Sequence, residues 1–223
     1  MNPGTHCDLA PLTAADVRAA AALHVRAFDR FFLSSLGEPF LREFYTGFVQ
    51  DPDAVTAVAR DPDGRLVGTV VGTVAPGMFF RRLLRRRGAR LALAAVPAVL
   101  RRPGVAVRVL RGLAYRGEVP VATRGALLSS ICVDPATEHG GHGRRLVDAW
   151  WRQVRRRGVT SAYLTTDAVD NDRVNAFYRR AGWTPAGSFT TAEGRPMNCY
   201  TRCAGVDADQ PVSASRHRPP VAG

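Results

Sequence analysis

The sequence predicts a mixed α/β (α+β) protein with a central sheet of about seven strands and helices on its faces. Three observations support this class. Short β-prone runs alternate with segments of helical periodicity, one pair of runs is joined by a tight polar turn, and another pair is separated by a Gly-rich turn and a helix. The hairpin is antiparallel and does not fit a simple repeated βαβ pattern, so the sheet is expected to be mixed.

The first third of the chain is expected to supply three strands and two helices. Thr13, followed three residues later by Asp16, resembles a capping box and predicts that a helix begins there. Aromatic residues at helical spacing indicate the buried face of a second helix. The turn 61–64, Asp-Pro-Asp-Gly, predicts a β-hairpin. In order, the expected elements are a strand over 8–12, helices over 14–28 and 38–49, and hairpin strands over 54–60 and 65–74.

Residues 76–117 differ in composition from the rest of the chain and are interpreted as an inserted segment. Eleven of the 31 basic residues, all of them arginine, lie between Arg81 and Arg116, and no acidic residue occurs from 65 to 117. Breaks at Gly88, Pro97, Pro103-Gly104 and Gly112 predict two or three short basic helices. The formal net charge of +12 is therefore largely a local patch, which favours an anionic partner over general coating of nucleic acid.

The basic insertion has two interpretations. It could be a solvated helical decoration whose arginine stems cover apolar surface. Alternatively, it could face an anionic membrane surface or a phosphorylated acceptor, because apolar side chains interleave with the arginines as they do in interfacial helices. Nucleic acid is not expected as a partner, since no recognition motif accompanies the charge. The longest apolar run, 91–100, is too short to span a bilayer.

The second half of the chain is expected to complete the sheet. Gly182 is expected to end the last helix. The residues after 204 are expected to form a disordered tail, 205–223, so the folded domain is predicted to cover 8–204. In order, the expected elements are a strand over 126–133, a helix over 143–157, a strand over 161–166, a helix over 172–181, and closing strands over 184–190 and 196–202.

Cysteine usage favours a reduced, cytoplasmic location. The four cysteines are dispersed and too few to staple 223 residues, and no segment resembling a secretory leader precedes them. Histidine and cysteine do not cluster with the spacing of a metal site, so none is expected.

The strongest motif lies between Val133 and Leu146, where a strand turns through glycines into a helix. Such a turn presents backbone N–H groups and the positive end of a helix dipole to one point, and Gly141 and Gly143 leave room for a phosphate there. A plain Gly-rich turn is the alternative. A Walker loop is excluded, because no Gly-Lys-Ser/Thr follows. A dinucleotide fold would need its first glycine directly after the strand, although Asp167 could contact a ribose.

Two motifs in order resemble those of the GNAT superfamily of N-acetyltransferases. After Val-Asp-Pro, the positions of Gly141, Gly143 and Leu146 match the acyl-CoA signature of that family. Asn171 is followed by Phe-Tyr and then by Gly-Trp, as in a second family segment. The resemblance extends more weakly over 8–204, apart from the insertion. It implies the GNAT fold, with the sheet splayed between its fourth and fifth strands, and acetyl-CoA as acyl donor.

Three residues of the loop depart from the family pattern. Glu138 stands where the family has Arg or Gln, His139 where it has its first Gly, and His142 where it has an apolar residue. A carboxylate beside a pyrophosphate is unfavourable, so weaker binding of CoA is expected, but not its loss. Both histidines are expected near the phosphates and not as metal ligands.

The resemblance also implies roles for individual residues. The pantetheine arm would pair with the backbone of Ile131, Cys132 and Val133, and Asn171 would reach that arm. Tyr178 would protonate the leaving thiolate, with core packing as its alternative role. The residues expected to surround the phosphates are Glu138, His139, Gly140, Gly141, His142, Gly143 and Arg144.

The general base is not identified by the motifs. Family members often place a glutamate near the strand of the acyl-CoA site, but 126–133 has none. Glu118 and Asp167 are the candidates. The expected activity is direct transfer of an acetyl group to a primary amine of a small, anionic or nucleotide- or lipid-linked acceptor. Two alternatives are a protein or peptide N-acetyltransferase and a non-catalytic acyl-CoA-binding module.

Overall fold

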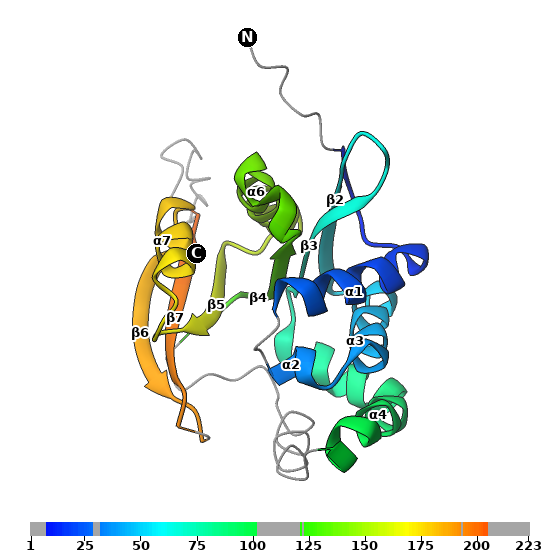
Figure 1. Cartoon of the computed structure of the whole chain (residues 1–223). Helices are drawn as coiled ribbons and strands as arrows, with labels where there is room; N and C mark the ends of the chain where they lie inside the picture. The colour runs from blue at the N-terminus through cyan, green and yellow to red at the C-terminus, as the bar shows by residue number, and fades with distance from the viewer. Residues whose placement is uncertain (1–7, 29–31, 102–120, 122, 193, 205–223) are drawn as a thin grey trace, which may run out of the picture.

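The computed structural model describes residues 8–28, 32–101, 121, 123–192 and 194–204 (Figure 1). Its strands form one seven-stranded sheet in the order β1-β2-β3-β4-β5-β7-β6. This arrangement confirms the predicted mixed sheet flanked by helices. The strands are β1 (Asp8–Ala10), β2 (Ala54–Arg60), β3 (Leu66–Thr73), β4 (Ala126–Val133), β5 (Ser161–Asp167), β6 (Thr184–Thr190) and β7 (Pro196–Cys203).

The sheet divides between β4 and β5. These two strands are parallel and pair only at their amino-terminal ends, Ala126 with Ala162 and Leu127 with Tyr163, whereas the other neighbouring strands pair antiparallel. The register of β3 with β4 shifts so that Ser129 is an extra residue on β4. Such a bulge bends a strand and adds twist. The expected splay between the fourth and fifth strands is therefore present.

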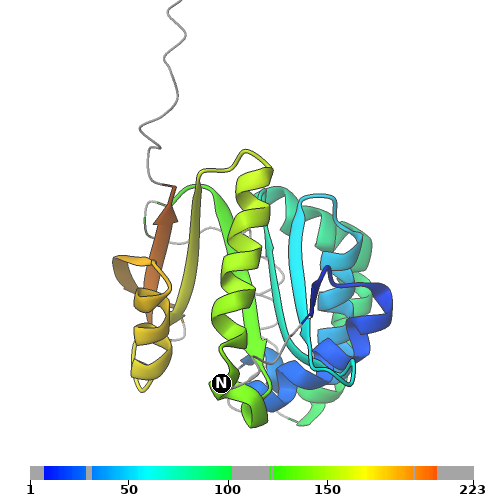
Figure 2. The same ribbon diagram turned by 90° about the horizontal axis from the view of Figure 1, so that it is seen from above.

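Helices cover both faces of the sheet. On one face lie α1 (Val17–Ala27), the short α2 (Phe32–Ser35) and α3 (Glu38–Gln50), with α4 (Pro76–Arg101) packed outside α3. On the other face lie α6 (His142–Arg156) and α7 (Asp172–Arg180), packed against the second core. Figure 2 shows α7, β5 and β7 on one side of α6, and α1, α3 and α4 on the other.

Each layer has its own apolar core. Leu23, Leu41 and Phe48 are buried on the α1–α3 face, and Trp150 and Leu164 are buried on the α6–α7 face. A fully buried side chain of this size contributes about 1.5–3 kcal/mol of transfer free energy. Helices therefore pack on both sides of the central strands, whereas β6 at the edge of the sheet is largely exposed.

The local signals of the sequence are confirmed at most boundaries. The Asp16 carboxylate accepts a hydrogen bond from the Thr13 backbone N–H at 3.0 Å, as the capping motif predicts, and a second one from the Thr13 hydroxyl at 2.7 Å. Most elements begin and end within about two residues of the expected positions. The predicted tail 205–223, part of the insertion (102–117) and Glu118 lie outside the described residues.

Within the described part of the insertion, the predicted breaks at Gly88 and Pro97 are wrong. This part, α4, is one helix of 26 residues that continues through Gly88 and Pro97. Glycine and proline cost a helix interior about 1 and 3 kcal/mol relative to alanine. Here the helix buries Phe79, Leu83 and Leu91 against the core, and this packing outweighs the local cost.

Within the described residues, the structure contains no helix of sufficient length and apolar character to traverse a membrane.

Candidate functional site

The candidate site begins where β4 ends and the chain turns into α6. A short 3-10 helix, η2 (Pro135–Gly140), follows β4, and α6 starts at His142. Gly141 joins the two with a φ of 69°, and a Cβ built there would meet nothing within 4 Å. Backbone conformation, and not lack of space, is therefore what requires glycine at this position.

The amino end of α6 lies beside the carboxyl end of β4. A Cβ on Gly143 would lie 3.5 Å from the Phe177 ring of α7 and 3.7 Å from the Val133 side chain, so this turn lies between β4 and α7. The first amides of a helix lack carbonyl partners within the helix and carry its positive dipole end. This turn can therefore bind an anion without charged side chains.

His142 adds a polar atom that lacks a partner. The residue is buried at 5% exposure, and its Nδ1 has no hydrogen-bond partner in the described structure. A buried polar atom without a partner costs about 1–3 kcal/mol. Its ring packs beneath Gly140, where a Cβ would come within 2.5 Å of Nε2. The sequence predicted His142 to be a loop residue near the phosphates, and the structure places it at the first position of α6.

In this structure the side chain of Arg144 contacts other protein groups. The guanidinium of Arg144 donates to the Asp148 carboxylate and to the Arg180 carbonyl, both at 2.7 Å. It therefore joins α6 to the end of α7, and its contact with phosphate stays a prediction. Glu138 and His139 lie in η2, but their side chains fall outside what the structure describes.

The carboxyl-terminal half of β4 has an edge that β5 does not cover. Ile131, Cys132 and Val133 pair with β3 on one side, and beyond Leu127 no pairing with β5 is recorded. An extended ligand could add to this edge as a strand would. Burial raises the pKa of the Cys132 thiol to about 12, so this thiol stays protonated and does not act as a nucleophile at neutral pH.

A hydrogen-bonded cluster fixes the opposite wall of the gap between β4 and β5. Asn171 donates to the Thr166 hydroxyl at 2.8 Å and to the Asp167 carbonyl at 3.0 Å, so its amide is engaged at the β5–α7 junction. Asn175 was not identified from the sequence. It donates to the Asp167 carbonyl and accepts from the Tyr200 hydroxyl at 2.9 Å.

Asn175 thereby ties α7 to β5 and β7. It is buried at 3% exposure in a helix that is otherwise rich in charged residues, one turn after Asn171. That spacing on a helix, a polar pair at i and i+4, is the signal that could have identified it.

Tyr178 lies in the core on the α6–α7 face of the sheet. Its ring contacts those of Phe177, Trp183 and Tyr200, with centroids 5.2, 6.2 and 5.9 Å away. Burial raises its pKa well above the ordinary value, and no hydrogen bond joins its hydroxyl to another described residue. The hydroxyl therefore carries a proton at neutral pH, which both the acid role and the packing role require.

Asp167 is engaged in an ion pair. Both carboxylate oxygens accept from Arg195 Nη2, at 2.6 and 2.7 Å. Both oxygens are therefore already engaged with the guanidinium of Arg195. Its role as base stays a prediction, as does that of Glu118.

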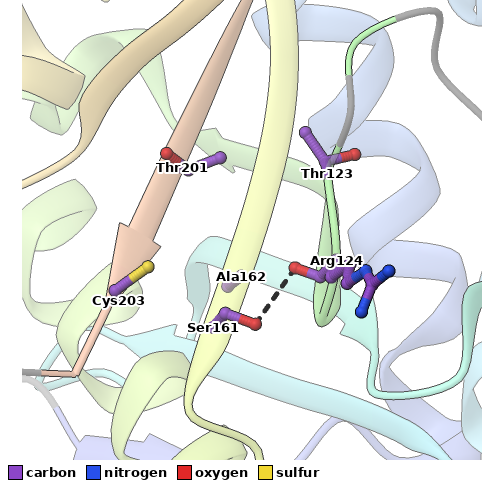
Figure 3. Close-up of a pocket in the computed structure, with 6 residues that line it drawn as sticks. All are labelled: Thr123, Arg124, Ser161, Ala162, Thr201 and Cys203. Atoms are coloured by element: carbon purple, nitrogen blue, oxygen red, sulfur yellow. Dashed lines mark hydrogen bonds between the residues drawn. The ribbon is translucent and has the colours of Figure 1, made fainter.

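A separate pocket of about 310 Å³ lies at the other end of the same strands (Figure 3). Its lining includes Arg124, Ser161 and Cys203, and the Ser161 hydroxyl donates to the Arg124 carbonyl at 3.1 Å. It sits where β4 and β5 are still paired, whereas the α6 turn lies where they have separated. This pocket is therefore not part of the candidate site.

Comparisons with known proteins agree with this geometry. The model of the acetyltransferase (GNAT) family matches residues 22–183. No curated protein sequence gives a significant match.

Solved structures share the fold at low sequence identity. The ribosomal-protein-S18-alanine N-acetyltransferase of Escherichia coli is 16% identical over 90% of this chain and 97% of its own, with a TM-score of 0.55. The PaiA N-acetyltransferase of Thermoplasma acidophilum, solved in complex with coenzyme A, is 11% identical over 89% and 99%, with a TM-score of 0.54. A spermidine N-acetyltransferase SpeG chimera from Vibrio cholerae is 13% identical over 89% and 96%, with a TM-score of 0.57. At these identities the likeness shows the fold alone.

Proposed function

Because the chain belongs to the GNAT acetyltransferase family and is thus an N-acetyltransferase, we propose that its donor is acetyl-CoA and its acceptor the primary amine of a small molecule. One observation carries the assignment of the donor site. The carboxyl end of β4, with its uncovered edge, adjoins the amino end of α6 and the unpartnered Nδ1 of His142. An extended chain that ends in a pyrophosphate matches both features.

The donor would be held mainly by backbone groups. The edge of Ile131 to Val133 would receive the pantetheine amides, and the amides that follow Gly141 would receive the pyrophosphate. His142 would supply a buried nitrogen to a phosphate oxygen or to a water bound to it. Because these contacts need no cationic side chain, the engagement of Arg144 with Asp148 does not conflict with them.

The chemistry is acyl transfer from a thioester to an amine. Bound acetyl-CoA supplies the activated acetyl group. The amine nitrogen bonds to the carbonyl carbon and the bond from that carbon to sulfur breaks, so the products are an amide and the thiolate of CoA. A backbone N–H near Val133 would polarise the carbonyl oxygen. The Tyr178 hydroxyl would give its proton to the sulfur.

The proton of the amine needs an acceptor. Asp167 is within the described structure but paired with Arg195, so it would act through water or after that pair opens. Glu118 is the other candidate. A substrate amine of low pKa is already neutral at physiological pH and makes little demand on a base.

The acceptor is proposed to be small and anionic. The excess of arginine over acidic residues supports this choice, because a positive field attracts an anionic substrate. A peptide acceptor is the second candidate, favoured by the name of the E. coli neighbour, which denotes an alanine of a ribosomal protein as its substrate. The cytoplasmic location expected from the cysteines stays a prediction.

The decisive experiment measures free thiol released from acetyl-CoA in the presence of a broad panel of amines and peptides. We expect turnover with at least one small amine and no mass shift of the peptides. Release of thiol with peptides alone would support the second candidate. Acetyl-CoA binding without turnover on any acceptor would support the non-catalytic module and contradict the proposal.

The donor site is tested by a matched pair of variants. Gly143→Asp places a carboxylate among the first amides of α6, whereas Gly143→Asn places a neutral group of the same size there. We expect Gly143→Asp to weaken acetyl-CoA binding by calorimetry roughly 100-fold, and Gly143→Asn to weaken it much less. Equal effects of the two variants would show that bulk, and not anion binding, matters at this position.

A further inference from the structure

The basic helix α4 is the largest feature that the proposed function does not use. Two of its arginines are turned inward and are structural. Arg82 donates to Asp51 at 2.6 and 2.7 Å and to Asp53 at 2.6 Å. Arg87 is buried and pairs with Glu43 and Gln50. Acidic groups from α3 and the turn after it therefore neutralise part of the cluster, which the sequence presented as an unbroken positive patch.

The outer face of α4 carries most of the remaining charge of the described part, and Arg101 at the end of the helix is also exposed. Arg81, Arg85, Arg86 and Arg90 are exposed, and no acidic side chain of the described residues contacts them. We use "outer face" for these four arginines together with four exposed apolar side chains. The apolar side chains, with their exposed fractions, are Met78 (49%), Leu93 (73%), Val96 (43%) and Leu100 (77%).

Two of the arginines lie on the same side of the helix as the apolar side chains, whereas Arg81 and Arg90, nine residues apart, lie at the opposite edges of that side. Leu93, Val96 and Leu100 are spaced by three and four residues, so they form one stripe. Arg85 and Arg86 stand two turns earlier, on either side of the same line. Four of the six large apolar side chains that are exposed in the described structure belong to this helix, so the exposure is concentrated here. Clustered exposed apolar surface marks a contact site more often than scattered residues do.

From this arrangement we propose that the outer face of α4 binds an anionic lipid surface. Headgroup phosphates would pair with the arginines, and the aliphatic stripe would enter the interface beneath them. Both halves of the face would then have a partner: the arginines an anion, and the leucines and valine an apolar medium.

Other occupants fit the outer face less well. A second copy of the chain packed face to face would bring the same unpaired arginines together. Residues 102–117 carry four arginines and no acid, so covering the face with them would also bring like charges together. Nucleic acid would satisfy the charge, but single strands bind by stacking on aromatic side chains, and the phosphates of a duplex would leave the aliphatic stripe without an apolar partner.

The proposal does not depend on the acetyl transfer. The α4 helix packs against α3, on the face of the sheet opposite α6. Contact of its outer face with a membrane would therefore not cover the turn that is assigned to the donor. Loss of one activity would leave the other measurable.

The test is cosedimentation of the full chain with phosphatidylcholine vesicles, prepared with and without phosphatidylglycerol. We expect binding only to the vesicles that contain phosphatidylglycerol. Replacing Arg81, Arg85, Arg86 and Arg90 with glutamine should reduce the bound fraction roughly tenfold or more. The double variant Leu93→Gln, Leu100→Gln should also reduce binding, because it removes the apolar part of the contact.

A matched control removes the same charge elsewhere. Arg18, Arg152, Arg156 and Arg179 are exposed on α1, α6 and α7, and their replacement with glutamine should leave binding nearly unchanged. If the control variant and the α4 variant lose vesicle binding equally, the binding depends only on the net charge of the protein, and the proposal is overturned. Full binding by the leucine variant would overturn the insertion of the stripe.

The remaining outcomes are also decisive. If the wild type does not bind the vesicles, the proposal is overturned. This holds also if the outer face then binds an oligonucleotide, or if it forms a dimer that the leucine variant dissociates. If a variant does not fold, a salt titration of the wild type takes its place, since binding that is insensitive to salt would contradict pairing with headgroups.

Discussion

At the scale of single residues, Tyr178 combines two properties that mutation can separate. Its ring is part of the core, whereas its hydroxyl has a raised pKa and no described hydrogen-bond partner. Tyr178→Phe keeps the ring and removes the proton. We expect kcat to fall roughly 100-fold while the melting temperature changes little, measured by thiol release and by thermal unfolding. Unchanged turnover with unchanged stability would assign the residue to packing alone.

His142 can be tested for binding and stability in one variant. His142→Leu fills similar space and removes the unpartnered Nδ1. If that nitrogen serves the donor, the Kd of acetyl-CoA should rise about tenfold, equivalent to about 1.4 kcal/mol, without loss of stability.

Ser34→Ala is the matched control for His142→Leu, because it also removes a buried polar atom without a partner, but on α2. It should leave the Kd unchanged. An unchanged Kd in His142→Leu as well would show that the orphaned nitrogen has no part in binding.

At the scale of elements, α4 shows how tertiary contacts override local signals. Gly88 and Pro97 are residues that usually interrupt helices, yet α4 continues through both. It does so because one side of the helix is buried and two of its arginines form ion pairs with acidic side chains. The hydrogen bonds from Arg82 to Asp51 and Asp53 raise the pKa of that guanidinium above its ordinary value, so it stays charged. The docking of α4 on α3 is therefore partly electrostatic.

Two arginines of the same helix provide the test of this docking. Arg82→Met removes the partner of Asp51, whose carboxylate is buried, whereas Arg85→Met changes an exposed side chain. We expect Arg82→Met to lower the free energy of unfolding by about 1–3 kcal/mol, because it leaves a buried charge unpaired, and Arg85→Met to change it by less than about 0.5 kcal/mol. Urea denaturation measures both. Equal changes would mean that the ion pair contributes nothing to docking.

At the scale of the whole molecule, His24 makes stability depend on pH. Burial lowers its pKa from 6.5 to about 4, and its Nδ1 lies 2.9 Å from the Tyr45 hydroxyl. In the unfolded chain, His24 therefore binds a proton near pH 6.5, whereas in the folded chain it binds one only near pH 4. Stability should fall as the pH decreases through this window, by roughly 3 kcal/mol in total.

The comparison of wild type with His24→Gln isolates this effect. Urea denaturation at several pH values should give a much flatter profile for the variant between pH 6.5 and 4. The pKa values of Asp16 and Asp134 are lowered, because their hydrogen bonds and ion pairs outweigh the effect of burial, so their contribution is lost only below about pH 4. The two sets of groups therefore act in different windows. Equal slopes for wild type and variant would show that His24 does not control the profile.

The sequence by itself determined the order and bounds of most elements, the Gly-rich turn before α6 and the family. Those features depend on short-range patterns: hydrophobic period, capping at Thr13, the Asp-Pro-Asp-Gly turn, and the glycines before α6. Only the tertiary structure decided that α4 is continuous, that Asp167 is held by Arg195, and that Asn175 fixes the wall of the gap. Several of these outcomes depend on contacts between residues about 30 or more positions apart, and short-range sequence patterns do not reveal such partners.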